Sequence, residues 1–174
     1  MVNFFLMLRL FYDNHALDLV LEDYLQMLLQ YISLAPDVLF TSSSFDLAFR
    51  CAMTGLTVVH TDIIFASLDF FRGIFMHDCM EPQTSATPPN FVIYASTIRS
   101  AMNKEGLQLV AYLVNGLVGD FPADAAAVVV SIFRTLVQVW SDQVPIWLAP
   151  VLEQLPATSV PNDAKAKFLQ EVTQ

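Results

Sequence analysis

Residues 61–77, TDIIFASLDFFRGIFMH, form the stretch that most restricts how this chain folds. Thr61 is a suitable N-cap, and Asp62 follows in the first turn, where the positive end of a helix favours a carboxylate. Large apolar residues then recur at helical spacing and cover most of the circumference: Ile63, Ile64, Leu68, Phe70, Phe71, Ile74 and Phe75. A helix that is apolar on nearly every side needs neighbours on several sides. The stretch therefore predicts an inner helix of a larger helical array.

The rest of the chain supplies such neighbours. Helical periodicity predicts further helices over residues 17–33, 45–58, 91–102, 107–118, 124–140, 143–155 and 163–172, with a helical turn at 38–40 and a kink or break at 103–106. There is little β signal, because the only β-branched triplet, residues 128–130, lies inside a helical period. Residues 1–16 are apolar but poorly patterned, and we interpret them either as the remnant of a helix cut off upstream or as an unreliable start, outside the repeats.

The expected helices pair in order as 17–33/45–58, 62–77/91–102, 107–118/124–140 and 143–155/163–172. These pairs follow one another at about 40 residues, the spacing typical of two-helix HEAT-type repeats. We therefore expect an all-α fold in which antiparallel helical pairs stack as a HEAT-repeat α-solenoid, an ARM-like superhelix, with about four repeats over residues 17–174. A closed bundle fits less well, because the central helices lack a broad polar face.

The composition narrows the classes of protein to consider. Hydrophobic residues make up 55% of the 174 and charged residues 14%, against about 45–50% and 25% in ordinary domains. A membrane-spanning helix needs about 18 or more apolar residues, whereas the uncharged run at 82–98 contains prolines and the runs at 24–36 and 106–119 are short. We therefore expect no membrane span. The net charge of -9 disfavours direct nucleic-acid binding and favours a basic protein partner.

The residues able to do chemistry form no recognisable constellation. His15, His60 and His77 share no helix face with one another or with a cysteine, so we interpret them as capping or boundary residues instead of metal ligands. Cys51 and Cys79 are expected to be reduced, buried thiols. Cys79 lies near His77, but nothing supplies a third orienting group or an oxyanion loop. We expect no enzymatic activity, no metal and no cofactor.

Carboxylates near the expected helix starts are the candidate binding residues. Six of them are spread over successive repeats: Asp18, Glu22, Asp23, Asp46, Asp62 and Asp69. Turns on one edge of a solenoid align into a common surface, so together these residues would attract a basic partner. Taken singly, each is better explained by favourable interaction with the helix dipole and by solubility.

Four stretches carry a resemblance to a known family. LEDYLQMLLQYISLAPDVLF (21–40) resembles a repeat in the C-terminal part of importin-β-type karyopherins, and TDIIFASLDFFRGIF (61–75) is similar to the next helix in the transportin-SR / importin-thirteen branch. GDFPADAAAVVVSIFRTLVQ (119–138) and VPIWLAPVLEQLP (144–156) are similar in order and spacing to the final repeats of that branch. The resemblance covers about residues 17–173 through degenerate hydrophobic patterns.

The resemblance implies a C-terminal segment of a nuclear transport receptor, present in nucleus and cytoplasm. Such receptors bind protein cargo, often arginine-serine-rich in this branch, and release it through the Ran GTPase. Ran-GTP binds mainly to an N-terminal arch that this chain does not contain, so Ran would act through the full-length receptor. The alternatives are a HEAT-repeat scaffold unrelated to transport and a membrane-associated or metabolite-binding helical protein.

Overall fold

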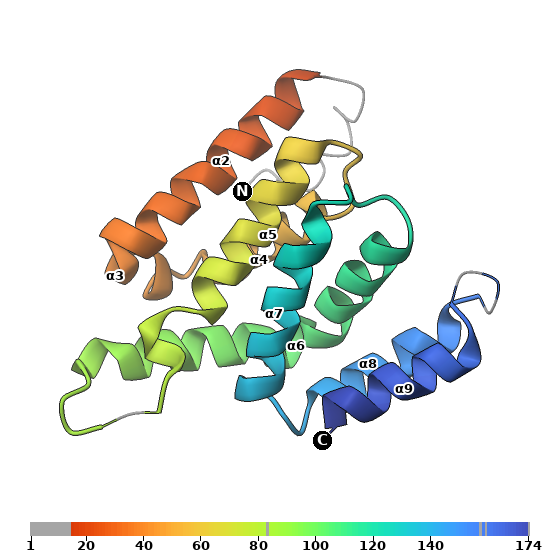
Figure 1. Cartoon of the computed structure of the whole chain (residues 1–174). Helices are drawn as coiled ribbons and strands as arrows, with labels where there is room; N and C mark the ends of the chain where they lie inside the picture. The colour runs from red at the N-terminus through yellow and green to blue at the C-terminus, as the bar shows by residue number, and fades with distance from the viewer. Residues whose placement is uncertain (1–14, 83, 157, 159, 174) are drawn as a thin grey trace.

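The computed structural model describes residues 15–173 except 83, 157 and 159, and in that part of the chain it is all-helical, with no strand. The helices are α2 (His15–Leu34), α3 (Pro36–Phe40), α4 (Phe45–Gly55), α5 (Thr61–Phe75), α6 (Pro89–Val118), α7 (Ala125–Val139), α8 (Val144–Gln154) and α9 (Asn162–Thr173), with a 3-10 turn η1 (Asp78–Met80) (Figure 1). The expected all-α class is confirmed for these residues. The N-terminal segment that sequence placed in no repeat lies almost wholly outside them.

Helix α5 is the centre of the core, as its apolar circumference predicts. It packs against α2, α4 and α7 (Figure 1), and its largest side chains, among them Leu68, Phe70 and Phe71, are fully buried. Burial on three sides explains why only a narrow strip of this helix is polar. The helix begins at Thr61 and His60 occupies the capping position without a side-chain hydrogen bond, so the predicted N-cap was one residue late.

Helices α2, α5 and α7 form one row, and α4, α6 and α8 form a second row beside it. The first row is parallel. Phe75 at the end of α5 packs against Trp140 just past α7, with ring centroids 5.5 Å apart, and Gly73 near the end of α5 lies against Ile32 near the end of α2. Figure 1 shows the three helices running in the same direction. The starts of α2, α5 and α7 therefore lie at the same end of the molecule.

Helix α6 continues through residues 103–106, so of the kink or break predicted there the break is wrong, as is the separate helix at 107–118. Figure 1 draws it as one ribbon that bends upward in its second half. Gly106 is buried, and a Cβ atom built on it would lie 2.7 Å from the Trp147 ring of α8. This glycine therefore permits close helix contact and does not end a helix.

The continuous α6 changes the predicted pairing. Residues 107–118 are not a separate helix and so cannot pair with 124–140 as an independent unit. The alternation between rows is instead α2 then α4, α5 then α6, and α7 then α8, with α9 packed on α8. Other boundaries moved by a few residues: α4 ends at Gly55 instead of 58, and α5 at Phe75 instead of 77. The short turn expected at 38–40 is confirmed as part of α3.

Polar contacts fix the first half of α6 beneath α3. The carboxylate of Asp37 accepts hydrogen bonds from the Asn90 amide, at 3.0 Å, and from the Tyr94 hydroxyl. The Thr97 hydroxyl donates to the carbonyl of Phe40 at 3.0 Å. These bonds join the two rows at the end opposite the starts of α2 and α5.

None of the helices in the described part of the chain is both long enough and apolar enough to cross a bilayer. This agrees with the absence of a span expected from sequence.

Candidate functional site

The predicted acidic residues fall into two groups in space. Asp18, Glu22 and Asp23 lie on the first turns of α2, and Asp62 lies on the first turn of α5. Because α2 and α5 are parallel neighbours, these four carboxylates belong to one end of the molecule. The structure thus brings together four of the six.

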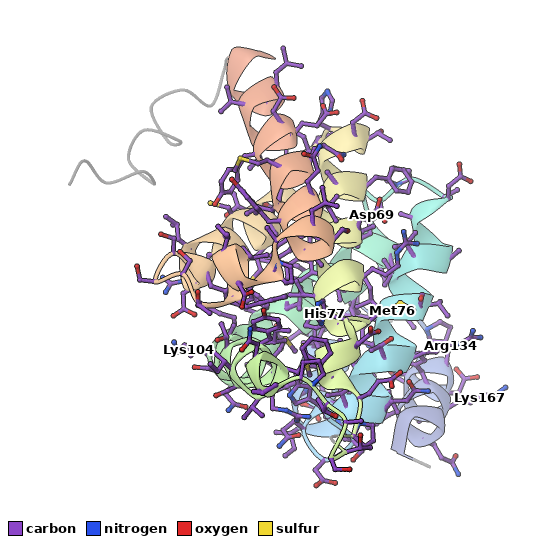
Figure 2. All side chains as sticks on the ribbon, turned by 90° about the vertical axis from the view of Figure 1, so that its left-hand side faces the viewer. Asp69, Met76, His77, Lys104, Arg134 and Lys167 are labelled. Atoms are coloured by element: carbon purple, nitrogen blue, oxygen red, sulfur yellow. The ribbon has the colours of Figure 1, made fainter. Side chains whose placement is uncertain are left out.

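The other two predicted carboxylates lie elsewhere and are ion-paired. Asp46 lies in the first turn of α4, whereas the last residue of α4 leads into the turn before α5. The length of α4 therefore separates Asp46 from Asp62. The carboxylate of Asp46 is 2.6 Å from the Lys104 ammonium of α6. Asp69 lies partway along α5, 2.8 Å from the guanidinium of Arg72 (Figure 2). Neither is a free negative charge for a partner.

The start of α7 adds two carboxylates that the sequence interpretation missed. Asp120 and Asp124 are exposed in the turn before this helix. We call the combined set the acidic rim: Asp18, Glu22, Asp23, Asp62, Asp120 and Asp124. The three segments that build it, residues 15–24, 56–64 and 116–128, contain no lysine or arginine. That local lack of positive charge was visible in the sequence and is the signal that would have found them.

Three side chains of the rim region converge more closely than the rest. One potential ligand atom from each of Glu22, His60 and Asp62 lies within 4.8 Å of the others. Among the described residues, no lysine or arginine forms an ion pair with either carboxylate. The His60 Nδ1 atom is buried and has no hydrogen-bond partner there. Sequence placed His60 correctly at a helix boundary but gave no reason to join it to Glu22.

A hollow of about 890 Å³ lies apart from the acidic rim, between the end of α5, η1, α6 and α7. Cys79 lines it, and its backbone N–H donates to the Nδ1 atom of His77 at 3.1 Å, so one of the two imidazole nitrogens is already engaged by the backbone. Burial raises the pKa of the Cys79 thiol to about 12, and burial also lowers the pKa of His77 while Asp78 opposes this. The arrangement does not activate the thiol as a nucleophile.

Both cysteines should therefore resist alkylation in the folded protein. Burial raises the pKa of Cys51 from 9.0 to about 11, and a rise of that size lowers its thiolate fraction at neutral pH about a hundredfold. Cys79 should react still more slowly, since its pKa is about 12. Time-resolved iodoacetamide labelling at neutral pH, read by mass spectrometry with and without denaturant, measures both rates. Native labelling of either thiol within tenfold of its denatured rate would contradict this.

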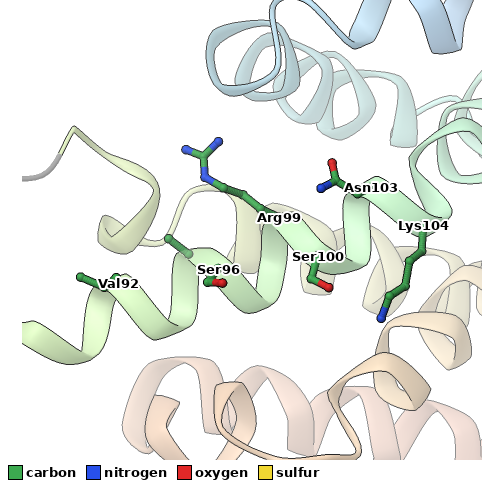
Figure 3. A pocket seen from close by; sticks show the side chains of 7 residues that line it. Val92, Ser96, Arg99, Ser100, Asn103 and Lys104 are labelled. Atoms are coloured by element: carbon green, nitrogen blue, oxygen red, sulfur yellow. The ribbon is translucent and has the colours of Figure 1, made fainter.

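A shallow depression of about 510 Å³ follows the exposed face of α6 (Figure 3). It is lined by Val92, Ala95, Ser96, Arg99, Ser100, Asn103 and Lys104. The two cations there have partners within the molecule. The Arg99 guanidinium lies 5.8 Å from the Trp140 ring centroid, and Lys104 points toward α4, where it meets Asp46. The face therefore offers hydroxyl and amide groups more than free positive charge.

Comparison with known proteins adds one distant relative. No protein-family profile matches the chain. The chain is similar to an uncharacterized protein of Schizosaccharomyces pombe (strain 972), with 22% identity over 154 residues. The match covers 86% of this chain and 16% of the relative, so the chain spans about a sixth of that protein's length.

Proposed function

We propose that the chain is a C-terminal segment of a nuclear transport receptor of the importin-β type, in the transportin-SR / importin-thirteen branch, and that it binds basic protein cargo. The observation that carries the proposal is the acidic rim, formed where three parallel helices of one row begin. Two rows of alternating helices are what stacked HEAT repeats produce, and such stacks expose extended binding surfaces. The sixfold longer relative fits a segment of a larger array.

An uncovered apolar stripe on α2 also supports a stacked solenoid. Val20, Met27 and Leu34 are exposed, and the half-buried Tyr24 and Tyr31 lie between them at helical spacing. This stripe is distinct from the buried side of α2 that packs on α5. In a solenoid each repeat contacts its neighbours, so a preceding repeat would cover such a stripe.

The rim would act through long-range attraction and loose ion pairs. Four of its carboxylates are solvent-exposed, and those of Asp18 and Glu22 are half-buried. At such positions attraction speeds encounter with a basic peptide and falls as salt rises, because the screening length is about 8 Å at physiological ionic strength. An arginine-serine-rich segment matches this charge. Ran-linked cargo release and movement between nucleus and cytoplasm would belong to the full-length receptor.

Substitution of rim carboxylates should weaken binding of an arginine-serine peptide. The variant Asp23→Asn, Asp62→Asn and Asp124→Asn takes one charge from each helix start of the row. Exposed ion pairs contribute about 0.2–1 kcal/mol each, so we expect about a tenfold loss of affinity. Fluorescence polarisation with a labelled peptide, at low and at physiological ionic strength and with a chelator present, measures it.

A matched control separates the rim from overall charge. Asp78→Asn, Asp142→Asn and Asp163→Asn remove the same charge from exposed positions at other helix starts. This control should bind as the unaltered protein does. Equal losses in both variants, or no peptide binding at low salt, would overturn the proposed role of the rim. A scaffold unrelated to transport would give that second result.

A further inference from the structure

The cluster of Glu22, His60 and Asp62 joins two helices at the acidic rim. Glu22 projects from the second turn of α2, whereas His60 and Asp62 flank the first residue of α5. Helices α2 and α5 are side by side in Figure 1. One potential ligand atom from each of Glu22, His60 and Asp62 already lies within 4.8 Å of the other two. The fold itself thus assembles the cluster from segments far apart in the sequence.

Among the residues that the structure describes, the cluster has no lysine or arginine paired with it to balance its charge. Two carboxylates this close repel each other, and no lysine or arginine within the described residues pairs with either. The His60 Nδ1 atom is withdrawn from water without a hydrogen-bond partner among those residues. A buried polar atom without a partner is costly unless something satisfies it. The charge and the imidazole together point to a cation.

We propose that Glu22, His60 and Asp62 form a Zn²⁺ site that clamps α2 to α5. One imidazole nitrogen and two carboxylate oxygens are a ligand set that Zn²⁺ accepts, with water in a fourth position. Mg²⁺ and Ca²⁺ fit less well, because they take six or more oxygen ligands. The proposed zinc site is a function separate from the proposed binding of basic protein cargo, and it does not depend on that binding.

Only a small movement closes the cluster around the ion. Zinc bonds to nitrogen and oxygen of about 2.0–2.2 Å place tetrahedral ligands about 3.3–3.5 Å apart. The ligand atoms therefore approach by little more than an ångström from their present spacing. Glu22 has three side-chain torsions, and Asp62 is exposed, so both carboxylates can turn without moving the helices. Binding would replace repulsion at the rim by a cross-link between neighbouring helices.

The test is a Zn²⁺ titration of the full chain without a polyhistidine tag, after treatment with chelator. Competition with a chromophoric zinc indicator gives stoichiometry and affinity. We expect one Zn²⁺ per chain with micromolar affinity, little response to Mg²⁺, and a rise in thermal midpoint on Zn²⁺ addition. Co²⁺ in place of Zn²⁺ should give visible bands of a low-symmetry nitrogen and oxygen site without thiolate charge-transfer absorption.

Matched variants locate the ion. His60→Gln and Asp62→Asn should each weaken Zn²⁺ binding by about tenfold or more. Loss of a residue that only hydrogen-bonds a metal ligand already costs about tenfold or more in metal affinity, and loss of the ligand itself should cost at least as much. His77→Gln and Asp142→Asn change the same residue types outside the cluster and the acidic rim, and both variants should bind Zn²⁺ as the unaltered protein does. Circular dichroism melting of each zinc-free variant checks that it folds.

Several outcomes would overturn the zinc site. They are an absence of stoichiometric Zn²⁺ binding by the folded unaltered protein, equal affinity in the cluster variants and their controls, or thiolate bands in the Co²⁺ spectrum. The rim proposal is read separately by the peptide assay with chelator present. Because the chelator removes Zn²⁺ in the peptide assay, a failure of the zinc site does not change the peptide result. Failure of one proposal is therefore distinguishable from failure of the other.

Discussion

Leu68→Ala is expected to lower the free energy of unfolding by about 2–5 kcal/mol. Leu68 lies in the middle of α5 with none of its surface exposed, and α5 is itself enclosed by α2, α4 and α7. Truncation removes apolar contacts and leaves a cavity that three surrounding helices cannot easily fill. Urea unfolding followed by circular dichroism measures the change.

Leu34→Ala is the matched control for that substitution. Leu34 ends α2 with 81% of its surface exposed, so the same chemical change should alter stability by less than about 0.5 kcal/mol. A loss below about 1 kcal/mol in Leu68→Ala, or equal losses in the two variants, would contradict a central position for α5.

Burial of α5 could be predicted from sequence because its apolar residues leave only a narrow polar strip. Ile63, Ile64 and Ile74, among others, cover directions that a surface helix would leave polar. The pattern does not depend on knowing which helix lies on which side. The identity of the neighbours, α2, α4 and α7, did depend on tertiary packing and could not be read from periodicity.

The continuity of α6 could not be predicted, because it depends on a contact with another helix and not on the residues of α6 alone. Asn103 and Gly106 are residues that commonly interrupt helices, and no local feature distinguishes an interrupting glycine from one that accommodates a neighbour. The neighbour is Trp147, which is distant in sequence. A contact between α6 and α8 thus decides a local conformation.

The acidic rim was predictable in part. Helix starts and their carboxylates were read correctly on α2 and α5, but sequence does not give helix direction in space. Asp46 therefore entered the predicted set although α4 is antiparallel to α5, and Asp124 was left out although α7 is parallel to it. The convergence of Glu22 with His60 required the register of α2 on α5, which no residue in either segment reports.

Gly106→Ala is expected to destabilise the protein by about 1–3 kcal/mol, although alanine favours a helix over glycine by about 1 kcal/mol. The added methyl group would lie 2.7–2.9 Å from three atoms of the Trp147 ring. An indole is rigid, so α8 or the whole side chain must shift. Gly73→Ala is the internal comparison, because its methyl group would lie 3.4 Å from the nearest atom, Cδ1 of Ile32, which is ordinary contact.

The two glycine substitutions should therefore differ in their effect on stability, with a loss for Gly106→Ala and no loss for Gly73→Ala. Both positions lie inside helices, so intrinsic propensity favours alanine equally, and only packing distinguishes them. Gly73→Ala should be neutral or stabilising by up to about 1 kcal/mol. Denaturant midpoints of both variants, measured together, provide the test. Stabilisation by Gly106→Ala would mean that α6 and α8 are not in close contact at this residue, and the second row of helices would then need a different packing.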